Sequence, residues 1–280
     1  MVNSFRILCP TDFSECSLNA IEYAAKLGEQ YQAELILFHV PDKEDYQKLS
    51  AGDATANDQY AFINKKLDNL VNTVSEESLS KGLKSCKGIV KEGKTVKTIL
   101  EFAIDIQADL IIMGTEGINE FKQNYVGTRS SKVVENADID VLIVPRRVYF
   151  KVPRKLVYAT DYLEEDKIAI QKVVELAKFF ESEIDIVHVS SKERTIDKAL
   201  HQSMIQEMEP FIKYDKVNFV LKSYRDEPAL GLENYLITAK GDILVTLSKK
   251  KSWFEQIFTN NLSRKMSYFI NKPLMVLKRG

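Results

Sequence analysis

Ile-Leu-Cys-Pro-Thr-Asp-Phe, at residues 7–13, is an apolar run that ends in the triplet Thr-Asp-aromatic. The run has a counterpart in Leu-Val-Tyr-Ala-Thr-Asp-Tyr at residues 156–162, which ends in the same way. The two aspartates, Asp12 and Asp161, are 149 positions apart. Both runs have the composition of a strand that ends in a polar loop.

A second pair of apolar runs repeats this spacing. Residues 35–40 and 184–189 both end in His-Val, and His188 follows His39 by the same 149 positions. Residues at helical spacing between the paired runs recur at that offset as well. They are Ala20, Ala24, Leu27 and Tyr31 in the first half and Ala169, Val173, Leu176 and Phe180 in the second. One spacing kept at several places indicates an internal duplication.

The remaining apolar runs complete the pattern. Helical stripes extend from Tyr60 to Val74 and from Ile196 to Phe211. Further runs are apolar on both faces, as buried parallel strands are, and they lie at residues 110–113, 141–144, 243–245 and 274–277. We therefore predict an α/β fold of two tandem doubly wound, Rossmann-like domains, each with a five-stranded parallel sheet flanked by helices.

The length of the chain and one short connector set the expected domain boundaries. A chain of 280 residues fits two domains of ordinary size, about 100–150 residues each. Two prolines, Pro145 and Pro153, bracket a short basic connector between the halves. We expect one domain at residues 1–147 and the other at residues 152–280, and so short a linker predicts tightly docked halves.

The charge balance and the hydropathy disfavour several functions. Lysine and arginine number 39 against 40 acidic residues, so the chain has no basic field to hold a nucleic-acid backbone or an anionic membrane surface. No apolar run approaches the roughly 20 residues that span a bilayer, and the start of the chain lacks the pattern of a signal peptide. We expect a cytoplasmic protein without a membrane partner, and nucleic acid is disfavoured as a partner.

The cysteines and histidines form no pattern typical of metal ligands. Cys9, Cys16 and Cys86 are scattered and lack CxxC spacing, which indicates reduced thiols. We interpret His39 and His188 as packing or hydrogen-bonding residues. The sequence assigns no catalytic residue and leaves the question of a metal open.

A glycine-rich segment follows the fourth predicted strand of the first half. Gly114 and Gly117 are separated by two residues, and after nine more residues Gly127 begins Gly-Thr-Arg-Ser-Ser, which leads into a helical pattern. Glycines let backbone N–H groups turn toward a phosphate, and hydroxyls at a helix start add donors where the helix dipole favours anions. We predict a phosphate over Gly127 to Ser130. The alternative is that Gly114 and Gly117 shape a turn while Thr128 caps the helix.

Asp12 adds a second polar feature at the end of the first predicted strand. In a doubly wound sheet this strand lies beside the fourth, and ligands bind at the carboxyl ends of such strands. A carboxylate there is suited to accept hydrogen bonds from a ribose or a base. The alternative is an Asx turn or a helix N-cap, although Ser14 and Ser17 are also able to cap that helix.

Together these features resemble the universal stress protein family. The shared motifs are Gly-x2-Gly-x9-Gly-Thr after an apolar strand and Pro-Thr-Asp-Phe-Ser near the N-terminus, and the resemblance covers both halves. In ATP-binding members, the first-strand aspartate and the valine that ends the second strand contact the nucleoside. The glycine motif and the hydroxyls after it hold the phosphates.

The resemblance assigns these roles to residues of this chain. Nucleoside contacts fall on Asp12 and Val40, and Met113 with the backbone of Pro10 and Thr11 completes the adenine wall. The phosphate contacts fall on Gly114, Gly117, Gly127, Thr128 and Ser130, with Arg129 in the same segment.

The chain departs from the family pattern in both halves. Glu116 places a negative charge inside the expected phosphate loop, and Arg129 stands where the family has an apolar residue. In the second half, Thr246, Lys249 and Thr259 stand where the glycines belong, and their β-carbons obstruct close approach to a phosphate. We predict one site per chain, in the first domain, for ATP or a related adenine nucleotide. The sequence leaves open whether magnesium accompanies it.

The resemblance also implies an internal partner. Family members commonly pair through their last strands, here residues 141–144 and 274–276, so we expect the second domain to be a non-binding pseudo-dimer partner of the first. A further homodimer stays open. Two other functions stay open as well: a slow nucleotide-hydrolysing or phosphate-transferring enzyme, and a nucleotide-free protein-interaction module.

One motif is rejected on its context. Residues 88–95 match the P-loop pattern G-x4-G-K-[ST], which requires an apolar strand before its first glycine. Residues 84–87 are polar, and the apolar pair Ile89 and Val90 lies inside the supposed loop. We interpret the match as the third strand and its exit turn.

Overall fold

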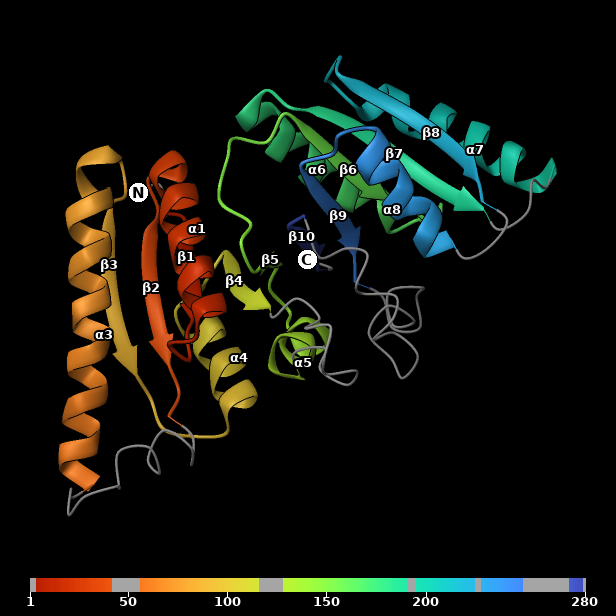
Figure 1. Cartoon of the computed structure of the whole chain (residues 1–280). Helices are drawn as coiled ribbons and strands as arrows, with labels where there is room; N and C mark the ends of the chain where they lie inside the picture. The colour runs from red at the N-terminus through yellow and green to blue at the C-terminus, as the bar shows by residue number, and fades with distance from the viewer. Residues whose placement is uncertain are drawn as a thin grey trace. The chain divides into compact units, whose positions relative to one another are not determined.

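The computed structural model describes residues 4–41, 56–115, 128–190, 195–224, 228–248 and 272–278. These residues fall into two compact units, of which the first ends at Phe150 and the second begins at Lys151. Both units are built from alternating strands and helices (Figure 1).

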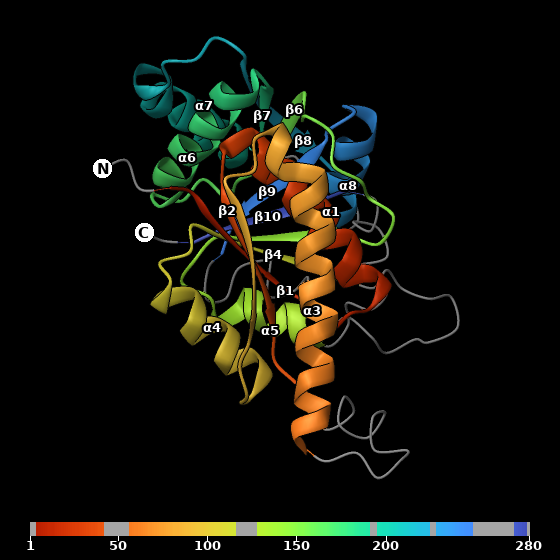
Figure 2. The same ribbon diagram turned by 90° about the vertical axis from the view of Figure 1, so that its left-hand side faces the viewer.

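Unit 1 is built around a parallel sheet of five strands. Its elements are β1 (Arg6–Pro10), α1 (Glu15–Tyr31), β2 (Glu34–His39), α3 (Ala56–Ser78), the 3-10 turn η1 (Leu79–Lys81), β3 (Ser85–Val90), α4 (Thr95–Asp105), β4 (Leu110–Thr115), α5 (Thr128–Asn136) and β5 (Val141–Pro145). The strand order is β3-β2-β1-β4-β5. Helices α1 and α3 cover one face of the sheet, and α4 and α5 cover the other (Figure 2).

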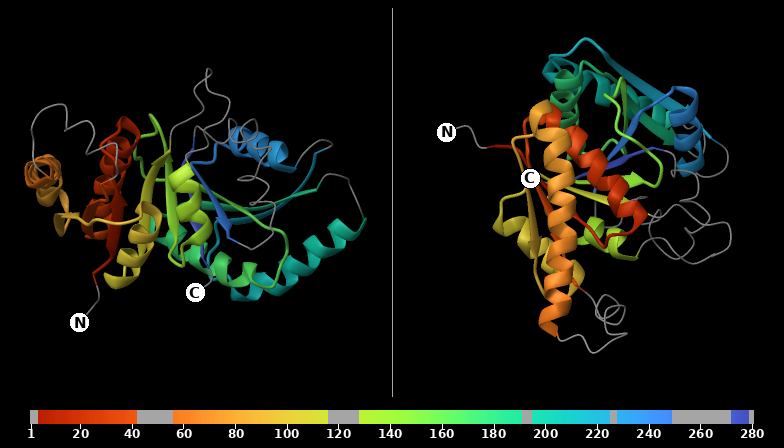
Figure 3. Two further views of the ribbon diagram at one scale, coloured as in Figure 1. Left: turned by 90° about the horizontal axis from the view of Figure 1, so that it is seen from below. Right: turned by 60° about the vertical axis from the view of Figure 1, so that its left-hand side comes forward.

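Unit 2 repeats this architecture. Its elements are β6 (Lys155–Ala159), α6 (Asp166–Phe180), β7 (Glu183–Ser190), α7 (Thr195–Met208), the 3-10 turn η2 (Glu209–Phe211), β8 (Val217–Ser223), α8 (Pro228–Thr238), β9 (Ile243–Leu247) and β10 (Leu274–Leu277). The strands are parallel in the order β10-β9-β6-β7-β8. Helices α6 and α7 lie on one face and α8 lies on the other (Figure 3).

The predicted fold class is confirmed in both units. The central strands are apolar because helices cover both faces of each sheet, and Ile7, Leu35 and Leu156 are fully buried. The expected boundaries at residues 147 and 152 stay predictions. After β5, the chain is fastened to α1, since Asn19 Nδ2 donates to the carbonyl oxygens of Pro145 at 3.2 Å and Val148 at 3.1 Å.

The second helical stripe is shorter than the sequence pattern predicts. In α7, Met204 and Met208 are buried, whereas Leu200 is 46% exposed and Phe211 is 67% exposed. The helix ends at Met208, and the 3-10 turn that follows contains Pro210. Proline lacks the N–H that would continue the helix, so Phe211 leaves the buried stripe.

The P-loop match is part of the sheet, as the sequence context indicates. Gly88 lies within β3, and a β-carbon there would come within 2.9 Å of Leu67 Cγ on α3. This glycine therefore lets a helix pack closely on the strand. Lys94 precedes α4, which begins at Thr95.

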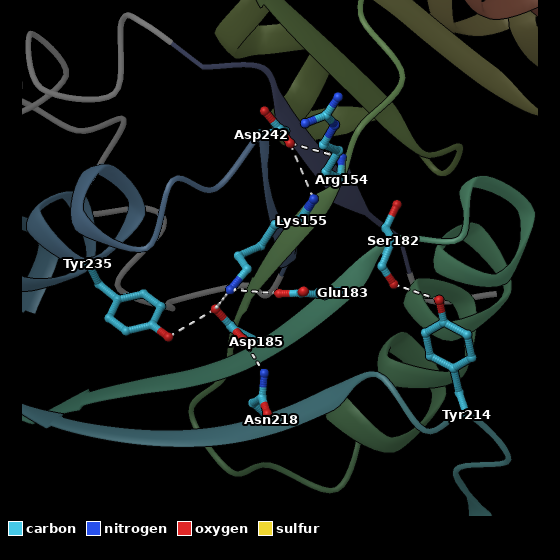
Figure 4. Close-up of polar contacts among 9 residues, drawn as sticks. All are labelled: Arg154, Lys155, Ser182, Glu183, Asp185, Tyr214, Asn218, Tyr235 and Asp242. Atoms are coloured by element: carbon cyan, nitrogen blue, oxygen red, sulfur yellow. Dashed lines mark hydrogen bonds and ion pairs between the residues drawn. The ribbon is translucent and has the colours of Figure 1, made fainter.

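A buried ionic cluster distinguishes the sheet of unit 2 (Figure 4). Asp185 on β7 is 2% exposed, and its Oδ2 lies 3.2 Å from Lys155 Nζ on β6. Tyr235 on α8 donates its hydroxyl to the same oxygen at 3.0 Å, and Asn218 Nδ2 donates to Oδ1 at 2.9 Å. Burial and the hydrogen bond to Asp185 raise the pKa of Tyr235 well above its ordinary value. Donors from three elements therefore compensate the buried carboxylate.

Unit 1 has an ion pair equivalent to that of Lys155 with Glu183, but it has an apolar residue in place of Asp185. Arg6 and Glu34 pair at 3.4 Å where unit 2 has Lys155 and Glu183, 149 positions later in the chain. By the same offset, Asp185 corresponds to Ile36, which is a buried apolar residue of β2. The same position in the fold therefore accepts either an apolar side chain or a fully compensated charge.

We expect Lys155→Met to lower the free energy of unfolding by about 3 kcal/mol, because the substitution leaves Asp185 buried without its cation. Lys155→Met/Asp185→Ile should recover part of that loss, because an apolar pair of similar volume replaces the ion pair, although Tyr235 and Asn218 lose their acceptor. Denaturant titration measures both. Lys178→Met, which breaks an exposed pair with Glu175, is the control and should change stability by less than about 1 kcal/mol. A double variant as unstable as the single one would contradict this account.

Candidate functional site

The predicted nucleoside residues of unit 1 gather at one edge of its sheet. Strand β1 lies between β2 and β4 and runs parallel to both, so the carboxyl ends of the three strands meet there. The connections leave β1 and β4 toward opposite sides, which makes this the switch point where ligands bind in open α/β sheets. The residues at this edge are Pro10, Thr11, Asp12, Val40, Met113 and Gly114.

The chain turns sharply between β1 and α1. Phe13 N donates to Thr11 Oγ1 at 3.0 Å, and Ser14 N donates to Asp12 Oδ1 at 3.0 Å. Ser14 is the N-cap of α1, and its hydroxyl accepts a hydrogen bond from Ser17 N at 3.3 Å. Asp12 therefore forms the Asx turn that the sequence left open as an alternative, and Ser14 rather than Asp12 caps the helix.

Asp12 presents a charged carboxylate at this edge. Its side chain is exposed. Partial burial tends to raise the pKa of Asp12, but hydrogen bonds from Ser14 and Ser17 outweigh that effect and lower the pKa below its ordinary value. The group is therefore an anion at neutral pH and is able to accept hydrogen bonds from a ligand hydroxyl or amine.

His39 both forms a hydrogen bond and packs against an aromatic ring, as the sequence interpretation expects. It is 1% exposed, and its Nδ1 lies 2.8 Å from the carbonyl oxygen of Thr11, which accepts the bond. The ring of Phe13 packs against the His39 ring with centroids 4.6 Å apart, and Lys66 Nζ lies 4.3 Å from the centroid of Phe13. His39 and Phe13 thus hold the backbone on both sides of Asp12. The shared 149-residue spacing of the histidines and the Thr-Asp-aromatic triplets was the sequence signal for this contact.

Gly114 has a packing role at the end of β4. A β-carbon at this position would come within 2.6 Å of the Cys16 carbonyl carbon and closer still to its oxygen. The strand therefore presses directly on the first turn of α1, where no side chain fits. This contact supports the alternative that Gly114 shapes the strand end, and it leaves a phosphate contact there as a prediction.

The remaining predicted residues are placed only in part. Val40 is 6% exposed just after β2, and Met113 is 7% exposed within β4. Thr128 begins α5, where Arg129 is exposed and Ser130 is 8% exposed. The side chain of Thr128 lies outside the described residues, as do Glu116, Gly117 and Gly127. The structure thus brings the predicted nucleoside residues to one edge of the sheet, while the roles of these residues and of the phosphate segment stay predictions.

The matching loop of unit 2 is organised around a buried acid. Asp166, at the position of Ser17 in unit 1, is 1% exposed. Its Oδ2 accepts from Thr160 Oγ1 at 2.7 Å and from Leu163 N at 2.9 Å, and its Oδ1 accepts from Tyr158 at 2.8 Å. Helix α6 begins at Asp166, two residues later than the 149-residue offset predicts from α1. The strand register places Leu247 where unit 1 has Gly114, and Thr246 where unit 1 has Met113, so the predicted alignment of Thr246 with Gly114 is wrong by one residue. The late start of α6 thus accompanies Leu247, which has a β-carbon where unit 1 has none.

An aromatic contact occupies the same edge of unit 2. Tyr162 stacks on His188 with ring centroids 4.2 Å apart, and its hydroxyl lies 2.6 Å from His201 Nδ1 on α7. Burial and the nearby His188 lower the pKa of His201 below its ordinary value. Tyr162 is therefore held by two histidines, whereas Phe13 in unit 1 has no hydroxyl.

Two negative findings apply to the part of the chain that the structure describes. Within it, no group of three or more histidine, cysteine, aspartate or glutamate side chains is arranged to hold a metal ion. Within the same residues, every helix is too short or too polar to cross a membrane.

Known proteins resemble this chain in sequence and in fold. A model of the universal stress protein family matches residues 4–145, more than half of the chain. A universal stress protein of Methanocaldococcus jannaschii is 28% identical over 148 residues, which are 50% of this chain and 82% of that protein. A universal stress protein from Archaeoglobus fulgidus has a similar structure over 98% of each chain, with a TM-score of 0.76 and 18% identity. A universal stress protein in complex with cAMP is 22% identical, covers 51% of this chain and 97% of its own, and has a TM-score of 0.37.

We expect Gly114→Ala to lower the free energy of unfolding by about 1–3 kcal/mol, because the added methyl group overlaps the backbone of α1. Chemical denaturation measures this loss. Gly28→Ala is the matched control, since its β-carbon would meet mainly the movable end of Leu83 and alanine favours the helix. Equal stability of the Gly114 variant and the native chain would show that β4 has room beside α1.

Proposed function

The chain belongs to the universal stress protein family, and we propose that its first unit binds ATP or a related adenine nucleotide at the edge formed by β1, β2 and β4. The observation that carries this proposal is Asp12, an exposed carboxylate with a lowered pKa at the switch point of the sheet. The stress role and the cytoplasmic location belong to the proposal and rest on the family.

The nucleoside end suits a ribose and a flat base. The Asp12 carboxylate accepts hydrogen bonds from the ribose hydroxyls, a role that dinucleotide-binding sheets give to an acid about 20 residues beyond the first strand. Val40 and Met113 offer apolar surface on the two neighbouring strands. The backbone of Pro10 and Thr11 lies between them at the end of β1.

The phosphates are assigned to the segment that ends in α5. Helix N-termini favour anions because their first N–H groups are unpaired and the helix dipole is positive there. Thr128 and Ser130 lie in the first turn of α5, and Arg129 adds a cation. Gly114, Gly117 and Gly127 complete the proposed site. The binding test asks whether the nucleotide requires magnesium.

Unit 2 is proposed to bind no nucleotide and to serve as the partner of unit 1 within the chain. The strand register places Leu247 at the position of Gly114, and the same offset along the sequence gives Lys250 and Asn260 for Gly117 and Gly127. β-Carbons at these positions hinder close approach of the backbone to a phosphate. The domain limits of 1–147 and 152–280, and the pairing of the units through β5 and β10, belong to this proposal.

We expect about one adenine nucleotide per chain. Nucleotide released from denatured protein is identified by mass spectrometry, and the emptied protein is titrated calorimetrically with ATP, ADP and cAMP, with and without magnesium. Asp12→Asn should weaken binding about 10–100-fold, the cost of losing a hydrogen bond to a charged group.

Asp161→Asn is the matched control, because Asp161 holds the same place in unit 2. It should leave the affinity unchanged. Equal losses from the two substitutions, or two equivalent sites, would disprove the restriction to unit 1. Absence of any binding would favour the protein-interaction module, and multiple turnover of ATP would favour the enzyme.

A further inference from the structure

The loop that carries Asp12 adopts a conformation that needs support. Phe13 has a φ of 61°, in the left-handed region. Bulky side chains are uncommon there, and such a conformation persists only where the surrounding structure fixes it. The direction in which Asp12 points therefore depends on what holds its two neighbours.

The polar groups of Thr11 are each engaged. Its N–H donates to the Phe38 carbonyl oxygen at 2.8 Å, and its carbonyl oxygen accepts from His39 Nδ1 at 2.8 Å. Its hydroxyl accepts from Phe13 N at 3.0 Å and contacts Ser17 Oγ at 2.9 Å. Because a carbonyl oxygen only accepts, His39 must carry a proton on Nδ1.

We propose that His39 is a positioning residue, which holds the Thr11–Asp12–Phe13 backbone in the conformation that binds the nucleoside. The histidine acts through its hydrogen bond to Thr11, and the packing of its ring on Phe13 is secondary. The inference rests on the proposed function for its ligand. It adds a buried residue of β2 that determines affinity without touching the nucleotide.

The energetic argument concerns the populations of loop conformations. Thr11 is 6% exposed, so loss of the His39 donor leaves a buried carbonyl oxygen unsatisfied, which is unfavourable. Conformers that turn this oxygen toward water then compete with the binding conformer. The apparent dissociation constant rises in inverse proportion to the population of the competent conformer.

Unit 2 supplies an internal control for this contact. His188 Nδ1 lies 2.8 Å from the Thr160 carbonyl oxygen, and Tyr162 has a φ of 58°. The same hydrogen bond and the same backbone conformation therefore occur in a unit that is proposed to bind no nucleotide. A substitution at His188 disturbs an equivalent contact and should leave the proposed ligand unaffected.

The test uses the full-length protein and two substitutions at His39. His39→Phe keeps a ring and removes the donor, and it should raise the dissociation constant for ATP about tenfold. His39→Asn places an amide donor near the position of Nδ1 and should bind within about threefold of the native chain, because the hydrogen bond is retained. His188→Phe should lower the melting temperature by an amount similar to His39→Phe and leave the dissociation constant unchanged.

A second measurement does not require a ligand. Hydrogen exchange of nucleotide-free protein should show faster exchange of the Phe13 and Ser14 amides in His39→Phe, and exchange near the native rate in His39→Asn. Native exchange of these amides in His39→Phe would overturn the proposal even if no nucleotide binds.

The binding outcomes separate the two proposals. If native protein binds ATP and His39→Phe binds equally well, the positioning role is wrong and the proposed function stands. If native protein binds no adenine nucleotide, the proposed function fails and the positioning role toward the nucleoside fails with it. The exchange data then show only whether His39 orders the loop.

Discussion

The parallel pairing of β1 with β2 on one side and β4 on the other is the constraint on which the rest of unit 1 depends. It opens the sheet edge where the connections diverge, and it places Asp12 and Gly114 on adjacent strand ends. The chain must also leave β1 and enter α1 within four residues, from Thr11 to Ser14. The Asx turn and the missing side chain at Gly114 follow from that short turn.

The two units stabilise this turn with different hydrogen-bond acceptors. In unit 1 the hydroxyls of Thr11 and Ser17 lie 2.9 Å apart, whereas in unit 2 the Asp166 carboxylate accepts from the Thr160 hydroxyl and from backbone amides. A carboxylate that collects donors from the whole turn is compatible with a helix that begins later. A later helix start leaves room for the β-carbon of Leu247, which stands where unit 1 has Gly114. We infer that the absence of a glycine at this position and the presence of Asp166 are one coupled difference in packing between the units.

Sequence periodicity predicted the strands, the helices on the two faces and the doubling of the fold, because burial on both faces imposes an apolar pattern on the strands. It misplaced Phe211, because Pro210 ends the helical geometry that the pattern alone would continue. It missed Asp185, since a buried charge contradicts the pattern and is tolerated only through donors distant in sequence. The acceptor of His39 was hidden for a related reason: it is a backbone carbonyl 28 positions away, which no side-chain motif records.

The contacts shared by the units separate what the fold requires from what a ligand requires. Both units keep the histidine, the threonine carbonyl and the left-handed aromatic residue, so these contacts belong to the turn out of the first strand. The units differ in what that turn presents. Unit 1 presents Asp12, exposed and charged, whereas unit 2 buries Asp166 and ties Tyr162 to His201. The proposed site of unit 1 is therefore separable from the fold, because the contacts that hold the turn are not the groups proposed to face the ligand.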